Sequence, residues 1–257
     1  MIELRGVYKT FGDSAPILAG VDLCVSKGET LVILGRSGTG KSVTLKHIIG
    51  LLKPDRGQVL VFGQDLASLS AKQLKETRRR VGYLFQDGAL LNWLNLADNV
   101  ALPLRENYRL SKAEIQQRVH QALATVELQD ASTKLPGEIS GGMRKRAGLA
   151  RALVAGPDVI LYDEPTSGLD PISSSIINRL VVNLKNTLGV TQIVVTHDMS
   201  SAFTIADRIV LLHDGSIIAE GTPAELRDSK HPGVDQFVQG KIDGPLSRRA
   251  TKSRPLD

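Results

Sequence analysis

The residue types best suited to chemistry gather in a glycine-rich stretch, GRSGTGKS, at residues 35–42. Its glycines let backbone N–H groups turn inward around phosphate oxygens, at the positive end of the helix that follows. Lys41 can reach the β- and γ-phosphates of a nucleotide, and the Ser42 hydroxyl can ligate Mg²⁺. We therefore predict a P-loop whose nucleotide-binding residues are Gly35, Arg36, Ser37, Gly38, Thr39, Gly40, Lys41, Ser42 and Val43.

Two adjacent carboxylates, Asp163 and Glu164, follow an apolar run at residues 159–162. Such a run indicates a strand buried on both faces, so the pair is expected at the end of a strand in a parallel sheet. We expect Asp163 to hold Mg²⁺ and Glu164 to polarise the attacking water. A further predicted strand at residues 191–195 leads to His197, which we expect to contact the γ-phosphate.

A second phosphate-binding element is predicted at the start of the segment ISGGMRKRAGLARAL, residues 139–153. Ser140 has the residue type of a helix N-cap, and Gly141 and Gly142 allow an anion to approach the free N–H groups of the first turn. This helix start lies far along the chain from the P-loop. We interpret it as part of a nucleotide site that another subunit completes.

Strands and helices that could position these residues alternate along the chain. We predict strands at residues 2–5, 17–25 (broken at Gly20), 31–34, 57–62, 81–85, 159–162, 191–195, 209–213 and 216–220. Helices are predicted at residues 43–52, 71–80, 114–126, 173–188 and 223–227, and after Ser140. The pattern indicates an α/β fold, with residues 87–156 as a helical insertion.

The composition indicates an ordinary globular protein, because 42% of the 257 residues are apolar and 23% are charged. The net charge of +5 is uneven: residues 241–257 have five Lys or Arg and two Asp, a net of +3, which leaves +2 for the rest. The basic excess therefore belongs to a tail, which is expected to be solvated or to contact acidic lipids or a partner. A nearly neutral body does not favour binding to a nucleic-acid backbone.

No uninterrupted apolar run approaches about 18 residues, so we expect no membrane-spanning segment. The first residues lack the basic and apolar regions of a signal peptide, and we expect the cytoplasm as the compartment. The single cysteine, Cys24, lies in the apolar segment VDLCV and is expected to be a small core residue. Residues 78–80, Arg-Arg-Arg, are expected to form a solvated helix end.

Taken together and in this order, the motifs GRSGTGKS, Gln86, ISGGMRKR, VILYDE, SGLD and His197 resemble the nucleotide-binding subunits of ABC transporters over roughly residues 1–235. The resemblance implies a P-loop NTPase fold: a RecA-like parallel core with an antiparallel β subdomain, plus an inserted α-helical signature subdomain at residues 87–156. It also implies ATP and Mg²⁺ as ligands and an ATP-sandwich dimer of two copies.

The family implies further roles by position. Phe11 falls where an aromatic side chain stacks on adenine, with Tyr8 as the fallback. Gln86 would contact Mg²⁺ and the attacking water. Ser140 and Gly142 would meet the γ-phosphate of ATP held by the other protomer, and Asp170 would communicate between the two sites.

Three features of the sequence narrow the resemblance within the family. Together they resemble the corresponding features in the ATPases of Mla-type phospholipid transporters, which work with MCE proteins. Met143 replaces the family's common Gln after SGG, the loop from Gln86 to residue 106 has a particular sequence, and the chain continues as an extension at residues 236–257. This resemblance implies an MlaE-type permease, an MCE lipid-binding protein and a small STAS-domain partner at the cytoplasmic face of the inner membrane. It also suggests that the extension reaches over the neighbouring ATPase.

Two alternatives remain open at this point. One is the ATPase of an importer for amino acids or another small polar solute, which would normally have Gln in place of Met143. The other is an ABC-type ATPase acting on nucleic acid or the ribosome, which would normally have two ATPase units or a long coiled-coil insertion. Trp93, in the loop after Gln86, is expected either in the core or at a permease contact.

Overall fold

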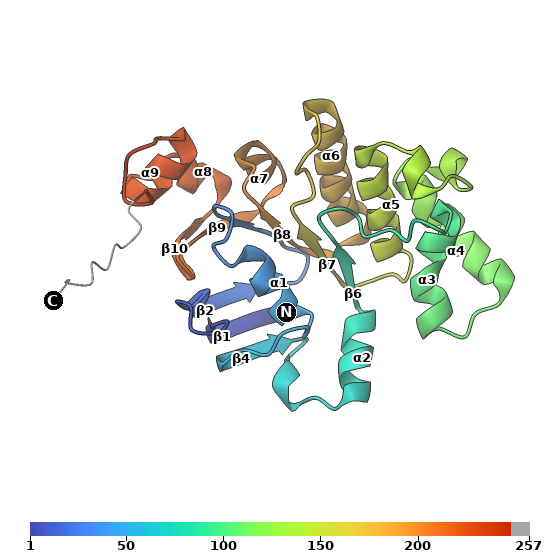
Figure 1. The fold of residues 1–257 in the computed structure, drawn as a ribbon, viewed down its shortest axis with the longest axis horizontal. Helices are drawn as coiled ribbons and strands as arrows, with labels where there is room; N and C mark the ends of the chain where they lie inside the picture. The colour runs from blue at the N-terminus through green and yellow to red at the C-terminus, as the bar shows by residue number, and fades with distance from the viewer. Residues whose placement is uncertain (248–257) are drawn as a thin grey trace.

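The computed structural model describes residues 1–247, and its strands form two sheets (Figure 1). The larger sheet has the order β10-β9-β3-β8-β7-β6, and the smaller sheet has the order β2-β1-β4-β5. In the larger sheet β9, β3, β8, β7 and β6 pair in parallel, and β10 pairs with β9 in the antiparallel direction. The larger sheet contains β3 (Thr30–Leu34), β6 (Val81–Leu84), β7 (Val159–Asp163), β8 (Thr191–Thr196), β9 (Arg208–His213) and β10 (Ser216–Gly221).

The central strands are buried on both faces, as their continuous apolar runs predict. Every residue of β3, β7 and β8 is buried. Alternate side chains enter two different cores, so that Val32 and Leu34 pack with the helices on one face, whereas Leu31 and Ile33 pack with the smaller sheet on the other. The strands are therefore held from both sides, and their carboxyl ends are fixed as a rigid edge.

The smaller sheet is antiparallel and covers one face of the parallel core. Its strands are β1 (Ile2–Lys9), β2 (Leu18–Val25), β4 (Arg56–Val61) and β5 (Gln64–Asp65). The predicted break at Gly20 is wrong, because β2 continues through this glycine at a φ of 86°, next to the ring of Tyr8. The predicted burial of Cys24 is also wrong: β2 alternates between buried and exposed residues here, and Cys24 lies on the exposed face.

The helices surround the larger sheet, and α3, α4 and α5 form a group beyond its edge strand β6 (Figure 1). Most of them agree with the predicted positions to within a few residues. Their bounds are α1 (Lys41–Ile48), α2 (Ala71–Arg79), α3 (Leu96–Asn107), α4 (Lys112–Thr125), α5 (Gly141–Leu153), α6 (Pro171–Leu188), α7 (Met199–Ile205), α8 (Pro223–Arg227) and α9 (Pro232–Gln239).

Several helix ends differ from the predictions for identifiable reasons. Helix α1 ends at Ile48, short of the predicted residue 52, because Gly50 takes a left-handed φ of 68° just beyond it. Helix α6 begins at Pro171, since Asp170 caps it and proline is suited to the first turn. The sequence does not predict helices α7 and α9, and it predicts α3 only as part of the helical insertion at residues 87–156.

Arg78 is not part of a solvated helix end as expected. Its guanidinium donates to the carbonyls of Ile49 at 3.0 Å and Gly50 at 2.7 Å, which are the free acceptors at the end of α1. Arg80 pairs with Asp158 at 2.7 Å instead. Arg78 and Arg80 therefore join the end of α2 to neighbouring elements.

Residues 240–247 fold back against α9. The buried side chain of Gln236 accepts from the Leu246 N–H at 2.7 Å and donates to the Ser247 hydroxyl at 2.6 Å. The Leu246 side chain is buried, and its carbonyl accepts from Arg36 at 3.1 Å. The start of the extension is thus tied to its own P-loop, while residues 248–257, where the basic tail was expected, lie outside the described part.

Among residues 1–247, none of the helices has both the length and the apolar character needed to cross a bilayer.

Candidate functional site

The P-loop joins the end of β3 to the start of α1. Gly38 and Gly40 take left-handed φ values of 83° and 101°, which L side chains rarely adopt. A Cβ on Gly35 would lie 2.5 Å from the Leu212 carbonyl, and one on Gly40 would lie 2.7 Å from that of Ile17. The loop therefore needs glycine at these positions, for its conformation or for its close packing.

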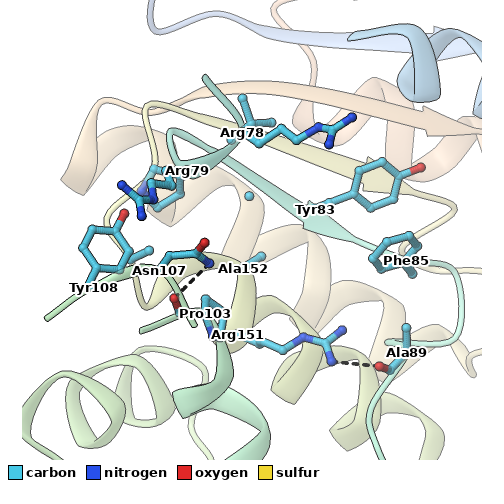
Figure 2. Close-up of a pocket in the computed structure, with 14 residues that line it drawn as sticks. Arg78, Arg79, Tyr83, Phe85, Ala89, Pro103, Asn107, Tyr108, Arg151 and Ala152 are labelled. Atoms are coloured by element: carbon cyan, nitrogen blue, oxygen red, sulfur yellow. Dashed lines mark hydrogen bonds between the residues drawn. The ribbon is translucent and has the colours of Figure 1, made fainter. Parts of the chain in front are cut away.

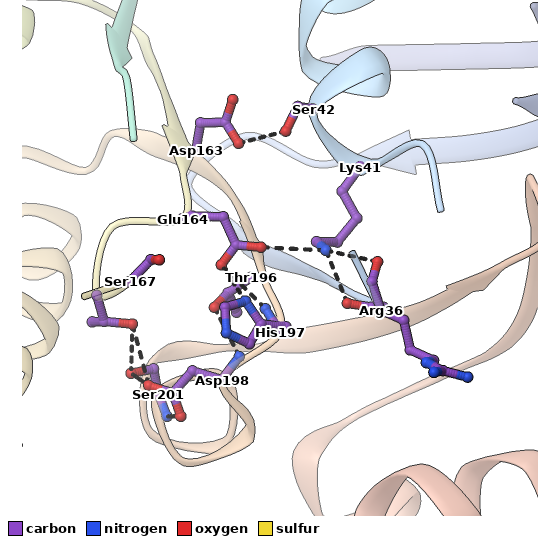
Figure 3. Close-up of polar contacts among 12 residues, drawn as sticks. Arg36, Lys41, Ser42, Asp163, Glu164, Ser167, Thr196, His197, Asp198 and Ser201 are labelled. Atoms are coloured by element: carbon purple, nitrogen blue, oxygen red, sulfur yellow. Dashed lines mark hydrogen bonds and ion pairs between the residues drawn. The ribbon is translucent and has the colours of Figure 1, made fainter. Parts of the chain in front are cut away.

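Lys41 points back into this loop. Its ammonium donates to the carbonyls of Gly35 at 2.9 Å and Arg36 at 3.1 Å, and it lies 3.2 Å from the Glu164 carboxylate (Figure 3). The side chain is only 5% exposed. A buried ammonium surrounded by oxygen atoms at the start of a helix is suited to bind phosphate oxygens. Of the other predicted contacts, the Thr39 hydroxyl donates to the Arg36 carbonyl, Ser37 lies in the turn of the loop, and Val43 lies in the first turn of α1.

Two side chains beside the loop, Ser42 and Asp163, have oxygen atoms that could bind a metal ion. The Ser42 hydroxyl donates to Asp163 at 2.7 Å, across the adjacent ends of the loop and β7. Tyr83 of β6 donates to the other oxygen of Asp163 at 3.1 Å, and its burial raises the pKa of the phenol far above the ordinary value. Tyr83 therefore stays protonated and holds Asp163 in place. A hydroxyl and a carboxylate fit Mg²⁺, which prefers oxygen ligands and normally keeps substrate phosphates and waters as the remainder.

Glu164 is the central side chain of the site. One of its oxygens faces Lys41, and the other accepts from the backbone N–H of His197 at 3.3 Å and lies 2.9 Å from the His197 Nδ1 (Figure 3). The side chain of Glu164 is 11% exposed, while that of His197 is 52% exposed. The predicted acidic pair, the P-loop lysine and the histidine thus meet at one edge of the parallel sheet.

Phe11 and Tyr8, the two candidates for stacking on adenine, lie in the loop after β1 and near the end of β1, respectively. Phe11 is exposed in the loop between β1 and β2, with the Lys9 ammonium 5.5 Å from its ring centre. Tyr8 is also exposed but packs against Gly20. The end of the same loop contacts the P-loop, since Ile17 lies beside Gly40. Phe11 is the freer of the two rings.

Gln86 follows β6, whose last residue pairs with Tyr162 of β7, so it leaves the sheet at the same edge as Asp163. Its side chain is exposed, and the described residues give it no hydrogen bond to Ser42 or Asp163. The loop after it is held by Arg151 of α5, which donates to the carbonyls of Gly88 and Ala89 at 2.8 Å. The structure therefore places Gln86 after the same sheet edge as Asp163, without direct contact with the predicted metal ligands.

The second phosphate-binding element is separate from the P-loop within one chain. Ser140 caps α5 by accepting from the Met143 N–H at 3.2 Å, and it is exposed. Gly141 and Gly142 form the first turn of α5 and lie against Leu169 of the neighbouring loop. Within the described residues, the start of α5 makes no hydrogen bond with the chain's own P-loop.

Asp170 is also occupied within its own chain. It caps α6 by accepting from the N–H groups of Ile172 at 3.0 Å and Ser173 at 2.9 Å. The Ser173 hydroxyl also donates to it, and this bond lowers the pKa of the Asp170 carboxyl below its ordinary value. Asp170 fixes the loop that runs from Glu164 to α6.

A groove of about 420 Å³ lies on another side of α5, between β6 and α3 (Figure 2). Tyr83 and Phe85 stack along it with ring centres 4.3 Å apart. Its described lining contains no carboxylate but contains Arg78, Arg79 and Arg151. Trp93, in the loop leading to α3, is 75% exposed, so the expectation that it lies in the core is wrong.

The sequence does not predict two residues of the site: Tyr83, which donates to Asp163, and Lys145, which donates to the backbone carbonyls of Glu164 and Ser167. Tyr83 lies in a predicted strand, and in the structure this strand pairs with β7. This strand pairing is the only feature that could have indicated a contact between Tyr83 and Asp163. Lys145 lies in a basic run, Arg144-Lys145-Arg146, which has the sequence of an ordinary solvated helix face.

Comparison with known proteins gives a family match. The family model described as ABC transporter matches residues 18–167. A "Probable ribonucleotide transport ATP-binding protein mkl" of Mycobacterium tuberculosis is 45% identical over 251 residues, which cover 98% of this chain and 70% of that protein. The "Intermembrane phospholipid transport system ATP-binding protein MlaF" of Haemophilus influenzae is 43% identical, with 96% of this chain and 93% of that protein covered. MlaF of Escherichia coli is 39% identical, with coverage of 97% and 92%.

Solved structures give the same result. A dimer of the ATP-binding cassette MJ0796 in a post-hydrolysis state, bound to ADP and phosphate, has a TM-score of 0.80 and 35% identity, with 87% of this chain and 99% of that chain covered. The cassette cbiO1 of Clostridium perfringens, part of a transporter complex, has a TM-score of 0.82 and 30% identity, with coverage of 94% and 95%. Both similarities extend over nearly the whole described chain.

Proposed function

This chain belongs to the ABC transporter family as an ATP-binding and ATP-hydrolysing subunit, and we propose that its ATPase cycle drives phospholipid transport between membranes. The observation that supports the catalytic part is the cluster of Lys41, Asp163, Glu164 and His197 around the P-loop. We take residues 1–235 as the ATPase domain, residues 87–156 as its inserted helical subdomain and residues 236–257 as an extension.

The P-loop residues bind and orient ATP. Lys41 exchanges its contacts with the carbonyls of Gly35 and Arg36 for the β- and γ-phosphate oxygens, without leaving its buried position. Ser42 and Asp163 would hold Mg²⁺, and Gln86 would be a further ligand. Mg²⁺, when bound, neutralises charge on the phosphates. Phe11 stacks on the adenine.

Glu164 polarises the attacking water. Its carboxylate is held from both sides, by Lys41 and by His197, so its position is fixed before a water approaches the γ-phosphate. His197 remains half exposed and can contact the γ-phosphate. The catalytic residues in this proposal are Glu164, His197, Gln86 and Lys41.

A second copy of the chain completes each site. Ser140, Gly141 and Gly142 present free N–H groups on a surface away from their own P-loop, where they meet the γ-phosphate bound by the partner. Asp170 lies on the loop between Glu164 and α6, and so connects the two sites. ATP then closes the dimer, and hydrolysis reopens it.

The substitution Glu164→Gln tests the catalytic assignment. We expect turnover to fall by about 10²–10⁴-fold while ATP still closes the dimer, because the amide keeps the shape of the side chain but cannot act as a base. ATPase assays of the purified chain measure this, with Glu76→Gln on exposed α2 as the matched control. ATPase activity unchanged by Glu164→Gln would remove Glu164 from the role of base.

The partner in the membrane is a permease of the MlaE type. The arginine-lined groove beside Tyr83 and Phe85 (Figure 2) and the exposed Trp93, in the loop that leads to α3, offer it docking surfaces. Because Arg151 holds the loop after Gln86, movement in the groove can reach the metal side of the site. A crosslinker placed at position 93 is expected to capture the permease.

The phospholipid assignment is supported by the two MlaF relatives, which match nearly the whole of this chain and are nearly fully covered themselves. MCE and STAS-domain proteins complete the proposed assembly at the cytoplasmic face of the inner membrane. The mycobacterial relative has a name that indicates ribonucleotides instead. Purification of the chain with its native membrane complex separates these possibilities.

An MCE protein and phospholipid are the expected co-purifying components. A solute-binding protein with a small polar solute would contradict the phospholipid assignment and favour an importer. Neither result would alter the ATPase assignment, which Glu164→Gln tests independently.

A further inference from the structure

Lys145 lies in the second turn of α5 and is directed toward the interior. The residue is only 5% exposed, although it lies between two other basic residues of the sequence. Its ammonium donates to the backbone carbonyl of Glu164 at 3.1 Å and to that of Ser167 at 2.5 Å. The helix that begins with Ser140 is thus tied to the loop that follows β7.

Burial disfavours the charge of Lys145, and neighbouring carboxylates favour it. Burial lowers the pKa of the ammonium, while the carboxylates of Asp87 and Glu164 act in the opposite direction. Asp87 directly follows Gln86 in the sequence. Burying a charge costs stability unless hydrogen bonds and opposite charges compensate for the lost water. The two carbonyls and the two nearby carboxylates provide this compensation, and they fix the position of the ammonium.

The backbone that Lys145 contacts has an uncommon conformation. Glu164 has a φ of 49°, in the left-handed region that residues other than glycine rarely adopt. Its N–H donates to the Val195 carbonyl at 2.9 Å, and its own carbonyl accepts from the Ser167 N–H at 3.2 Å. Lys145 adds a charged donor to this same carbonyl. The direction of the Glu164 side chain depends on this turn, because φ and ψ fix where the Cβ points.

We propose that Lys145 is a positioning residue that holds the backbone of Glu164, and with it the carboxylate, in the geometry needed for hydrolysis. It contacts neither ATP nor water itself. Lys145 lies five residues after Ser140 on the same helix. It therefore also connects the start of α5, which is proposed to meet the partner's nucleotide, to Glu164, the proposed catalytic base of its own site. This inference rests on the proposed role of Glu164 as the base.

The substitution Lys145→Met tests this role, because methionine fills a similar volume without a donor or a charge. Replacing a buried charge by an apolar side chain often leaves stability unchanged or raises it, so the fold is expected to remain. We expect kcat for ATP hydrolysis by the full-length chain to fall by about 10–100-fold, as a misplacement of about 1 Å can produce. The KM for ATP should stay within about threefold, since the P-loop contacts are intact.

Two further variants sharpen the result. Lys145→Arg keeps the charge and several donors, and it should recover at least part of the lost kcat. Lys72→Met, at an exposed lysine of α2, is the matched control and should leave kcat, KM and Tm unchanged. A kcat for Lys145→Met within about twofold of the parent would overturn the inference. So would a loss accompanied by a lower Tm or by a KM that rises in proportion, because these indicate a structural role.

Glu164→Gln, measured in parallel, separates this inference from the proposed function. If Glu164→Gln is inactive and Lys145→Met is fully active, only the role of Lys145 fails. If Glu164→Gln is active, the assignment of Glu164 as the base fails, and the role of Lys145 that rests on it fails as well.

Discussion

The geometry of Glu164 shows how a single residue can satisfy several constraints. Its carboxylate lies between Lys41 of the P-loop and the end of β8, which provides His197. Its backbone turns in a left-handed conformation immediately after the buried strand β7. Each contact comes from a different part of the chain, so the side chain can be oriented before substrate binds. Such preorganisation is the principal way in which an enzyme lowers a barrier without moving its own groups.

Either Phe11 or Tyr8 could stack on the adenine of ATP, and the effects of substituting each ring on ATP binding distinguish the two. The ring of Phe11 is exposed and free to stack, whereas that of Tyr8 packs against Gly20. We expect Phe11→Ala to weaken ATP binding by about 3–10-fold, the usual size of one aromatic stack, and Tyr8→Ala to change it less. Equilibrium titration with a fluorescent ATP analogue measures both. A larger loss for Tyr8→Ala would assign the stack to Tyr8.

At the residue scale, sequence motifs predict the part of the site in which residue type and strand position together determine the chemistry. Ser42 and Asp163 could be paired in advance, because a P-loop and an acidic strand end must meet at one sheet edge. Tyr83 and Lys145 could not, since their contacts arise only from tertiary packing of β6 and α5. Cys24 was misplaced because its apolar neighbours hide the alternation of a strand with one exposed face.

At the scale of elements, long periodic segments were predictable and short ones were not. Helix α7 has seven residues and begins shortly after β8, so the sequence predicts only the end of the strand there, although Asp198 is a suitable N-cap. Helix α9 has Pro232 at its start and Gly240 in a left-handed conformation after its end, and both are recognisable signals in the sequence. The local charge of the sequence predicts a solvated Arg78, but its acceptors are carbonyls at the end of α1.

The extension is an element whose role a matched pair of truncations can determine. Removing residues 236–257 deletes Gln236, which binds residues 241–247 together, and also the contact of Leu246 with Arg36. We expect this truncation to weaken assembly of the dimer or the membrane complex. Removing only residues 248–257 leaves the Gln236 contacts in place and is the control.

Size-exclusion chromatography and ATPase assays measure the effect of both truncations. Normal assembly together with normal activity after removal of residues 236–257 would exclude a role for the extension in holding the complex. A loss already seen with the shorter truncation would assign that role to residues 248–257.

At the scale of the whole molecule, the two phosphate-binding elements do not meet within one chain. The P-loop lies at the edge of the parallel sheet, whereas Ser140 starts α5 in the helical group beyond β6 (Figure 1). Each element has the free N–H groups of a helix start. Two copies arranged head to tail would bring the P-loop of one chain to Ser140 of the other, and ATP would lie between them.

ATP-dependent dimerisation tests this central claim most directly. In the Glu164→Gln background, analytical ultracentrifugation should show a shift from monomer to dimer when ATP is added. Adding Ser140→Arg, which places a long side chain where the partner's γ-phosphate would lie, should abolish the dimer and leave ATP binding to the single chain intact. Ser111→Arg, which removes the equally exposed N-cap of α4, is the control and should still dimerise. A dimer that forms as well with Arg at position 140 as with Ser would contradict the claim that the partner completes the site.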